Sequence, residues 1–227
     1  MRPHHPIAVL LDLDGTLVDT VPLILESVRY AFQDRDRRPT DAEWIAGIGT
    51  PLRVQLVPFT DGPDDLEAVV ARYRVHQRAH HDRMTRAYVG ALEAVRTIKD
   101  RGHPVAVVTG KLGEPAARTL AFVGLAPFVD ALVGSDSCPR HKPDPQPVLL
   151  ALERLGRTPG EALFLGDSPI DVRAGNAAGV TSVGALWGAC TREALVAAEP
   201  HHLLESVEAL PALVALLSAR RPQPGCG

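Results

Sequence analysis

The stretch Ile7-Ala8-Val9-Leu10-Leu11-Asp12-Leu13-Asp14-Gly15-Thr16 decides the fold of this chain. Five apolar residues that run into turn-forming residues are typical of a strand buried on both faces, as strands are in parallel sheets. Parallel sheets place their ligand sites just beyond the carboxyl ends of the strands. The two aspartates therefore enter such a site together, where one carboxylate can act as nucleophile or metal ligand while the other moves a proton.

Taken alone, the Asp-Gly pair is also compatible with an ordinary turn, but three further strand-like runs end in polar residues. The run 105–108 precedes Thr109-Gly110-Lys111, the run 131–133 precedes Gly134-Ser135-Asp136, and the run 162–165 precedes Gly166-Asp167-Ser168. The carboxyl ends of parallel strands share one edge of a sheet. The repetition therefore predicts that these polar groups meet at a single site.

The spacing of these strand ends predicts the architecture. Thr109 and Asp136 are 27 positions apart and Asp136 and Asp167 are 31 apart, each close to the roughly 30 residues of a strand–helix–strand unit. Asp12 and Thr109 are 97 positions apart, which leaves room for an inserted domain of roughly 65 residues. We predict an α/β fold, a doubly wound parallel (Rossmann-like) sheet core over residues 1–16 and 85–219 with an inserted helical cap domain over 17–84.

Helical hydrophobic spacing supports this division. Inside the insert it favours helices over 21–32, 41–48, 52–59 and 65–83, with Asp19 or Thr20 as the first N-cap and no strand. In the core, helices are expected over 91–101, 114–122, 146–155 and 170–178, each followed by a glycine that suits a helix C-terminus. A last strand over 181–186 is followed by a helix that ends near residue 219, and the tail 220–227 is expected to be disordered.

Composition excludes several classes of protein. The 227 residues are 45% hydrophobic and 22% charged, with a formal net charge of −3, so the charge does not favour nucleic acid as a partner. The sequence contains no apolar run of the roughly 18 residues that a membrane span needs, and its first residues do not resemble a signal peptide. Three widely spaced cysteines fit a reducing compartment. We expect a cytoplasmic monomer or homodimer that acts on a small molecule.

Taken as a set, the motifs resemble one known family. Asp12-x-Asp14-Gly-Thr, a strand that ends in Thr109, the Lys142-Pro-Asp-Pro turn and Gly-Asp167-x-x-x-Asp171 together resemble the haloacid dehalogenase superfamily of phosphohydrolases. The order and spacing match over essentially the whole chain. The segments 141–148 and 185–187 are similar to those of the phosphoglycolate phosphatase group and its pyrophosphatase subgroup.

This resemblance implies a role for each residue of the set. Asp12 would attack phosphorus and become an aspartyl-phosphate, while Asp14 would protonate the leaving oxygen and then take a proton from the hydrolytic water. Asp12, the backbone carbonyl of Asp14, and Asp167 would hold Mg²⁺, a cation that suits phosphate sites. Thr109 and Lys142 would bind the phosphoryl oxygens. Asp171 would orient water or Lys142 from behind the metal ligands.

Three of these roles have a plainer alternative. Thr109 can cap the following helix, Lys142 can be a solvated turn lysine, and Asp171 can be an acid in an ordinary first helical turn. Ser168 can equally be the cap of that helix or a ligand. Gly110 departs from the family pattern, which has Asn, Ser or Thr at that position. This departure removes one possible contact to phosphate or water.

The remaining candidates are weaker. Thr50 and Arg53 lie where related caps reach toward the substrate, and Arg53 can recognise a carboxylate or a second phosphate. Lys111 does not complete a nucleotide-binding P-loop and is expected to be a surface or rim residue. The i, i+4 spacing of His76 and His80, with His81 beside them, can hold a metal, but a solvated helix face explains it as well. Trp187 is expected to pack at the sheet edge.

The sequence thus predicts a Mg²⁺-dependent phosphatase for a small phosphorylated metabolite, either a phosphoglycolate-like monoester or pyrophosphate. A β-phosphoglucomutase-like mutase shares both aspartates but relies on basic cap residues to hold a second phosphate. A haloacid dehalogenase does not need Asp14. A phospho-receiver domain is about half this length and lacks the insert.

Overall fold

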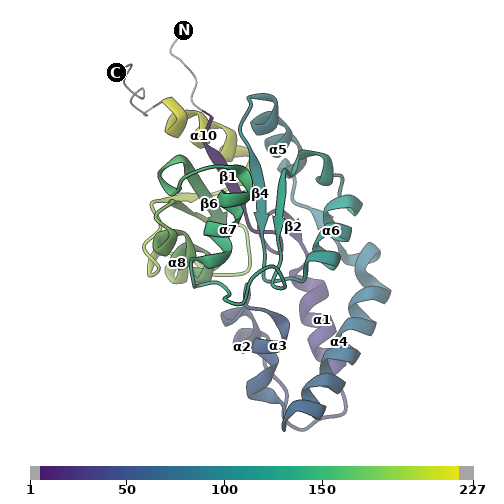
Figure 1. Cartoon of the computed structure of the whole chain (residues 1–227). Helices are drawn as coiled ribbons and strands as arrows, with labels where there is room; N and C mark the ends of the chain where they lie inside the picture. The colour runs from purple at the N-terminus through teal and green to yellow at the C-terminus, as the bar shows by residue number, and fades with distance from the viewer. Residues whose placement is uncertain (1–5, 220–227) are drawn as a thin grey trace.

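Residues 6–219 are described by the structure, a computed structural model (Figure 1). The proposed tail 220–227 lies outside the described residues. Within them, one sheet has the strand order β5-β4-β1-β6-β7-β8, and every neighbouring pair is parallel. Its strands are β1 (Ala8–Leu11), β4 (Val105–Val108), β5 (Ala131–Val133), β6 (Ala162–Gly166), β7 (Thr181–Ala185) and β8 (His202–Leu204).

Helices cover both faces of this sheet because its strands are apolar on both sides. Val9 and Leu11 face the cluster that includes α5 (Ala91–Asp100), α6 (Gly113–Phe122) and α10 (Leu210–Ala219). Ala8 and Leu10 face the opposite cluster, to which α7 (Gln146–Leu155) and α8 (Pro169–Ala178) contribute. Alternate side chains along β1 therefore pack into two separate cores, one on each face of the sheet. The predicted Rossmann-like α/β class is confirmed.

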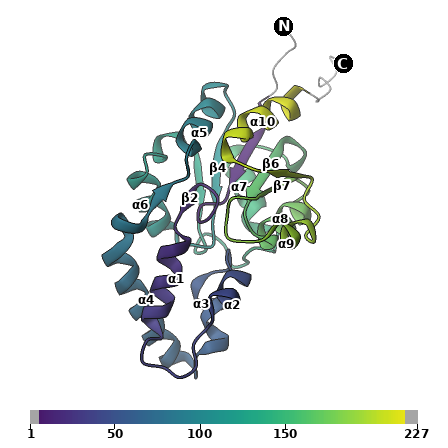
Figure 2. The ribbon, with the colours of Figure 1, turned by 180° about the vertical axis from the view of Figure 1, so that it is seen from behind.

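The cap lies beyond the carboxyl ends of the strands, as both ribbon views show (Figures 1 and 2). It contains α1 (Val21–Ala31), α2 (Asp41–Ala46), α3 (Leu52–Leu56), the short η1 (Val57–Phe59) and α4 (Pro63–Met84). These helices bury their own apolar cluster, in which Phe32, Trp44 and Leu56 are almost fully buried. The cap thus has a core of its own, separate from the two cores of the sheet.

The link between cap and core contains strands that we did not expect. β2 (Val18–Asp19) pairs antiparallel with β3 (Arg86–Ala87), so the two crossings between core and cap run side by side. Two residues per strand are too short to produce a visible alternation in the sequence. The expectation of an insert without strands was wrong at this point.

The region after β7 also differs from the prediction. Instead of one helix, the chain forms α9 (Arg192–Val196), then β8, the turn η4 (Val207–Ala209) and α10. β8 is a half-buried edge strand of three residues that pairs with β7, so its pattern is too short to stand out. The other short 3-10 turns are η2 (Ala126–Phe128) and η3 (Pro159–Glu161).

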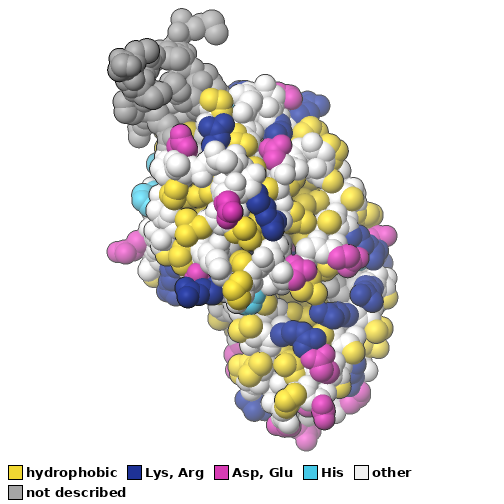
Figure 3. Space-filling view, viewed as in Figure 1, with side chains coloured by type: hydrophobic (Ala, Val, Ile, Leu, Met, Phe, Trp, Pro, Cys, Tyr) yellow, Lys and Arg dark blue, Asp and Glu magenta, His cyan; other side chains and the backbone are white. Residues whose placement is uncertain are grey.

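The surface carries charges of both signs. Lys and Arg side chains lie interspersed with Asp and Glu over core and cap on the face that Figure 3 shows. In residues 6–219, no helix combines the length and the apolar character needed to cross a membrane.

Candidate active site at the carboxyl edge of the sheet

Lys142 lies at the centre of the site. Its Nζ donates to Asp12 Oδ1 at 2.7 Å, to Asp171 Oδ1 at 2.5 Å and to the Val108 carbonyl at 3.2 Å. Its side chain is 2% exposed, so the alternative of a solvated turn lysine is wrong. Burial alone would lower the pKa of Lys142, but the attraction of Asp12 and Asp171 outweighs it and raises that pKa, so the ammonium stays charged.

Three carboxylates gather around this ammonium. Oxygen atoms of Asp12, Asp167 and Asp171 lie within 4.8 Å of one another, and all three residues are buried. Burial raises the pKa of Asp12, against the opposing effect of Lys142, and Asp171 and Asp167 raise it further. Burial, with Asp171 beside it, raises the pKa of Asp167 to about 7. With all three carboxylates ionised, the negative charge of the cluster would exceed the positive charge of Lys142.

The charge of the three carboxylates bears on whether Asp12, Asp167 and Asp171 could hold a metal ion. A divalent cation with oxygen ligands is the group that a buried set of carboxylates accepts best, and Mg²⁺ prefers such ligands. Asp12 and Asp167, two of the predicted ligands, lie in the cluster. Asp171 joins them, whereas the predicted contribution of Asp14 is its backbone carbonyl. The donor set fits Mg²⁺.

Asp167 is held in a narrow cradle. Its Oδ1 accepts from Thr16 Oγ1 at 3.1 Å and its Oδ2 from the Ala189 amide at 2.8 Å. A Cβ on Gly15 would lie 2.3 Å from Asp167 Oδ2, and a Cβ on Gly188 would lie 2.1 Å from Asp167 Cβ. The loop after β7 thus contributes to the site through backbone groups and a missing side chain, which the sequence analysis did not detect.

Trp187 begins that loop and packs against the motif after β1. Its Nε1 donates to the Thr16 carbonyl at 2.9 Å, and it contacts the core cluster that contains Leu13 and Leu17. The expectation that Trp187 packs at the sheet is consistent with this position. The bond joins the loop after β7 to the loop that carries Asp12 and Asp14.

Asp171 combines the two interpretations that the sequence left open. It is the third residue of α8 and forms a capping box with Ser168, whose Oγ donates to Asp171 Oδ2 at 2.5 Å. Its other oxygen accepts from Lys142. The helix start therefore fixes one oxygen of Asp171 so that the other can orient Lys142.

Asp14 lies beside the cluster and is held by two donors. Thr20 Oγ1 donates to Asp14 Oδ1 at 2.5 Å, so the hydroxyl of the N-cap residue of α1 does not cap that helix. Lys111 Nζ lies 2.6 Å from the same oxygen. The Lys111 side chain is only 9% exposed, so the expectation of a surface lysine was wrong, whereas a position at the rim of the site is compatible with this partial burial. Nothing local in its sequence indicated a partner 97 positions away.

Thr109 faces the site rather than the next helix. It is 5% exposed, and its Oγ1 accepts from the Lys111 amide at 3.2 Å. The following helix α6 has Leu112 as its N-cap residue and no side-chain cap. The alternative in which Thr109 caps that helix is therefore wrong.

The structure brings Thr50 near the core but not Arg53. The carbonyl carbon of Thr50 lies 3.3 Å from the position that a Cβ on Gly110 would take. Arg53 is half exposed and forms a two-pronged ion pair with Glu67 of α4. Its guanidinium is thus already occupied on the surface of the cap.

The histidines of α4 have separate partners. His76 Nδ1 lies 3.1 Å from Ser27 Oγ of α1, and its ring contacts that of His80 at an interplanar angle of 57°. His81 is buried, with Nε2 2.9 Å from Thr119 Oγ1 of α6 and Nδ1 2.6 Å from Asp82. His81 therefore joins the cap to the core, and the expectation that it lies on a solvated face was wrong. In the described residues, these histidines do not belong to a metal-binding group of three.

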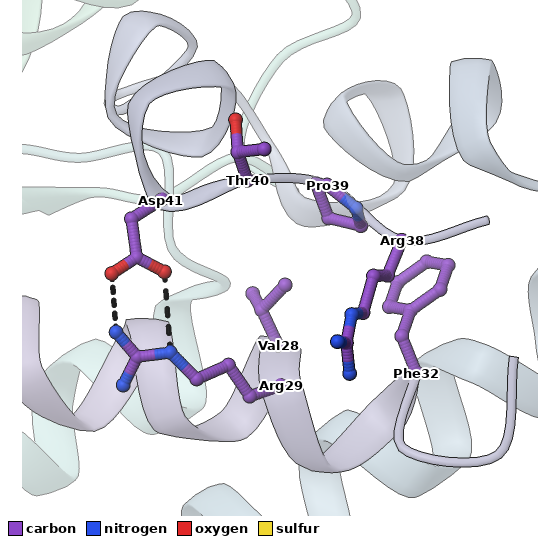
Figure 4. Close-up of a pocket in the computed structure, with 7 residues that line it drawn as sticks. All are labelled: Val28, Arg29, Phe32, Arg38, Pro39, Thr40 and Asp41. Atoms are coloured by element: carbon purple, nitrogen blue, oxygen red, sulfur yellow. Dashed lines mark hydrogen bonds and ion pairs between the residues drawn. The ribbon is translucent and has the colours of Figure 1, made fainter. Parts of the chain in front are cut away.

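A larger cavity, of about 340 Å³, lies within the cap (Figure 4). Its apolar floor is Val28 of α1 and Phe32, the C-cap residue of that helix, and its polar wall is the ion pair between Arg29 and Asp41. None of the candidate residues lines it. The candidate catalytic residues therefore lie outside this cavity, at the carboxyl edge of the sheet.

Comparison with known proteins identifies the class that this fold and site define. A family model for haloacid dehalogenase-like hydrolases matches residues 9–185. The chain belongs to that family, and its relatives place it among the phosphohydrolases of the superfamily.

Two relatives cover nearly the whole chain. A PpaX protein of Caldanaerobacter subterraneus is 37% identical over 201 residues, which cover 88% of this chain and 90% of that protein. "Pyrophosphatase PpaX" of Bacillus pumilus is 32% identical over 206 residues, covering 91% and 95%. Among solved structures, a predicted phosphoglycolate phosphatase from Haemophilus somnus has a TM-score of 0.82 at 22% identity and covers 92% of this chain and 97% of that one. This last likeness shows the shared fold.

Proposed function

We propose that this chain is a Mg²⁺-dependent phosphatase that hydrolyses a small phosphorylated compound through an aspartyl-phosphate on Asp12. The observation that carries the proposal is the buried group at the end of β1. There the Asp12 carboxylate is oriented by Lys142 and lies within 4.8 Å of Asp167 and Asp171. A carboxylate in this setting can attack phosphorus once the negative charge of the phosphoryl group is balanced.

Mg²⁺, held by Asp12, Asp167 and the carbonyl of Asp14, would supply much of that balance. Lys142 adds a fixed positive charge next to the attacking carboxylate, because Asp171 holds its ammonium in place. Thr109 offers a hydroxyl at the neighbouring strand end to bind a phosphoryl oxygen. Asp14, the second acid of the motif, would protonate the leaving oxygen and afterwards remove a proton from water.

We further propose pyrophosphate as the substrate, with a phosphoglycolate-like monoester as the second candidate. The two relatives cited above carry the name PpaX, and one of them is named a pyrophosphatase. The structure adds that the partly buried Lys111 ammonium contacts Asp14. Because Asp14 would serve the leaving group, a cation beside it suits a leaving group that is itself anionic, such as phosphate.

The proposal is tested by assaying the purified protein with Mg²⁺ on pyrophosphate, 2-phosphoglycolate and p-nitrophenyl phosphate. We expect kcat/KM for pyrophosphate to exceed that for p-nitrophenyl phosphate by at least tenfold. Preference for 2-phosphoglycolate would move the proposal to the monoester. Failure to release phosphate from all three would contradict the phosphatase assignment.

Lys111 and Arg53 offer a direct comparison of two cations. Lys111→Ala should lower kcat/KM for pyrophosphate about tenfold or more, in line with the roughly 1.5–3 kcal/mol of a charge-assisted hydrogen bond. Arg53→Ala should change it less than about twofold, because its exposed ion pair with Glu67 contributes little. Steady-state kinetics of both variants on pyrophosphate measure the two values of kcat/KM. A larger loss of kcat/KM for Arg53→Ala than for Lys111→Ala would indicate that Arg53 of the cap, and not Lys111, contacts the substrate.

Asp14→Asn tests the acid role through the leaving group. An alkyl phosphate needs its leaving oxygen protonated, whereas p-nitrophenolate leaves readily without a proton. We therefore expect kcat to fall at least about tenfold further on 2-phosphoglycolate than on p-nitrophenyl phosphate. The two kcat values of the variant, each relative to wild type, are the measurement. Equal losses on both would remove Asp14 from proton transfer.

A further inference from the structure

Gly110 lies in direct backbone contact with the cap. A Cβ at this position would lie 2.4 Å from the Gly49 carbonyl oxygen, 3.0 Å from its carbon and 3.3 Å from the Thr50 carbonyl carbon. These are backbone atoms of a turn, so they cannot swing aside as the end of a flexible side chain can. Any side chain at residue 110 would therefore push the whole turn away.

The glycine is not needed here for its backbone conformation. Gly110 does not have a positive φ, in contrast to Gly49, whose φ is 93°. Other residues can adopt a φ outside the left-handed region without strain. Gly110 matters here because it lacks a Cβ, whereas the family pattern has a larger polar residue at this position.

The turn 47–51 closes the entrance to the site through this contact. On its other side, a Cβ on Gly49 would lie 3.1 Å from Ser168 Oγ in the loop after β6. The turn thus lies between the loop that carries Thr109 and the loop that carries Asp167. The cavity left beneath it measures about 10 Å³ and is lined in part by Pro51, Thr109 and Lys142, which is about the space of one water molecule.

We propose that Gly110 is the residue that sets how far the cap closes, and thereby the size of leaving group that the closed enzyme accepts. Without a side chain, the turn approaches Thr109 and Lys142 until backbone meets backbone, which suits a compact substrate and excludes a bulky one. Adding a Cβ would displace the turn by about 1 Å, and a displacement of that size in a catalytic site can cost roughly 100-fold in rate. The choice of substrate rests on the phosphatase function proposed above; the closure contact does not.

The test compares Gly110→Ala with Gly113→Ala. Gly113 is the first residue of α6, three positions after Gly110, but its added Cβ would approach the Asp136 carboxylate at 3.3 Å, and that side chain can move. Hydrogen exchange of the peptide 45–56, measured by mass spectrometry, reports closure without any substrate. We expect Gly110→Ala to speed this exchange several-fold with an unchanged melting temperature, and Gly113→Ala to leave it at the wild-type rate.

Activity provides the second readout. In Gly110→Ala, the ratio of kcat/KM for pyrophosphate to that for p-nitrophenyl phosphate should fall at least tenfold, because the compact substrate depends on close approach of the cap. A damaged core would lower both activities together. Wild-type exchange in Gly110→Ala, or an unchanged ratio of the two activities, would overturn the proposal. If the wild type hydrolyses neither substrate, the phosphatase function fails, and the exchange rates still decide whether Gly110 sets closure.

Discussion

Asp12→Asn is expected to abolish turnover while the protein stays folded. The amide that replaces the carboxylate is neither an adequate nucleophile for phosphorus nor a good ligand for Mg²⁺, so the variant loses both roles at once. Each 1.36 kcal/mol added to the barrier costs about tenfold in rate, and we expect a loss of at least 1,000-fold. Lys142 keeps its bond to Asp171 in the variant, so the cluster retains its cation pairing.

Two measurements check this result. Phosphate release on the preferred substrate gives the rate, and acid quenching with ³²P-labelled substrate shows whether phosphate is bound to the protein. Wild type should carry label and Asp12→Asn should not. Asp100→Asn, an exposed aspartate at the end of α5, is the control and should behave as wild type. Residual activity above about 1% in Asp12→Asn would contradict the covalent mechanism, because a required nucleophile contributes far more than a factor of 100.

The second large effect is expected from Mg²⁺ and Asp167. Activity should need added Mg²⁺ and disappear with EDTA. Asp167→Asn should remove most of the response to the metal, because it replaces a charged oxygen ligand of the cluster. The same change should stabilise the metal-free protein, since it removes the cost of burying the Asp167 carboxyl group next to Asp171. Melting temperatures with EDTA and with increasing Mg²⁺ measure both effects.

The pH dependence of this stability follows from the pKa of Asp167. Burial raises that pKa from its ordinary value of 3.8 to about 7 in the folded chain. Between about pH 4 and pH 7 the unfolded chain has lost this proton and the folded chain still holds it, so the stability of the metal-free protein should fall as the pH rises. Mg²⁺ binds the ionised form, so its stabilising effect should be larger at pH 8 than at pH 6. Full activity in EDTA, or a metal response in Asp167→Asn equal to that of wild type, would remove Asp167 from the metal site.

The sequence by itself determined every strand of the parallel sheet except β8, and with them the strand ends that carry Asp12, Thr109 and Asp167. The signals that predict the strands and helices are local. Apolar runs, the glycines that end helices and the hydrophobic periodicity can each be recognised within about ten residues. The excess length between Asp12 and Thr109 indicated the insert, and its helical pattern indicated a bundle. The family resemblance then assigned roles to residues whose spacing matched a known set.

Only the tertiary structure decided which polar groups are partners. Lys111 reaches Asp14 across 97 positions and Lys142 reaches Asp12 across 130, whereas Arg53 turns away to Glu67. Long basic side chains look alike in a sequence, because exposure and pairing depend on which distant segments meet around them. The same holds for Gly110. A missing Cβ has consequences only once the turn of the cap lies against it, and that contact exists because two separately folded cores are held together at the carboxyl edge of the sheet.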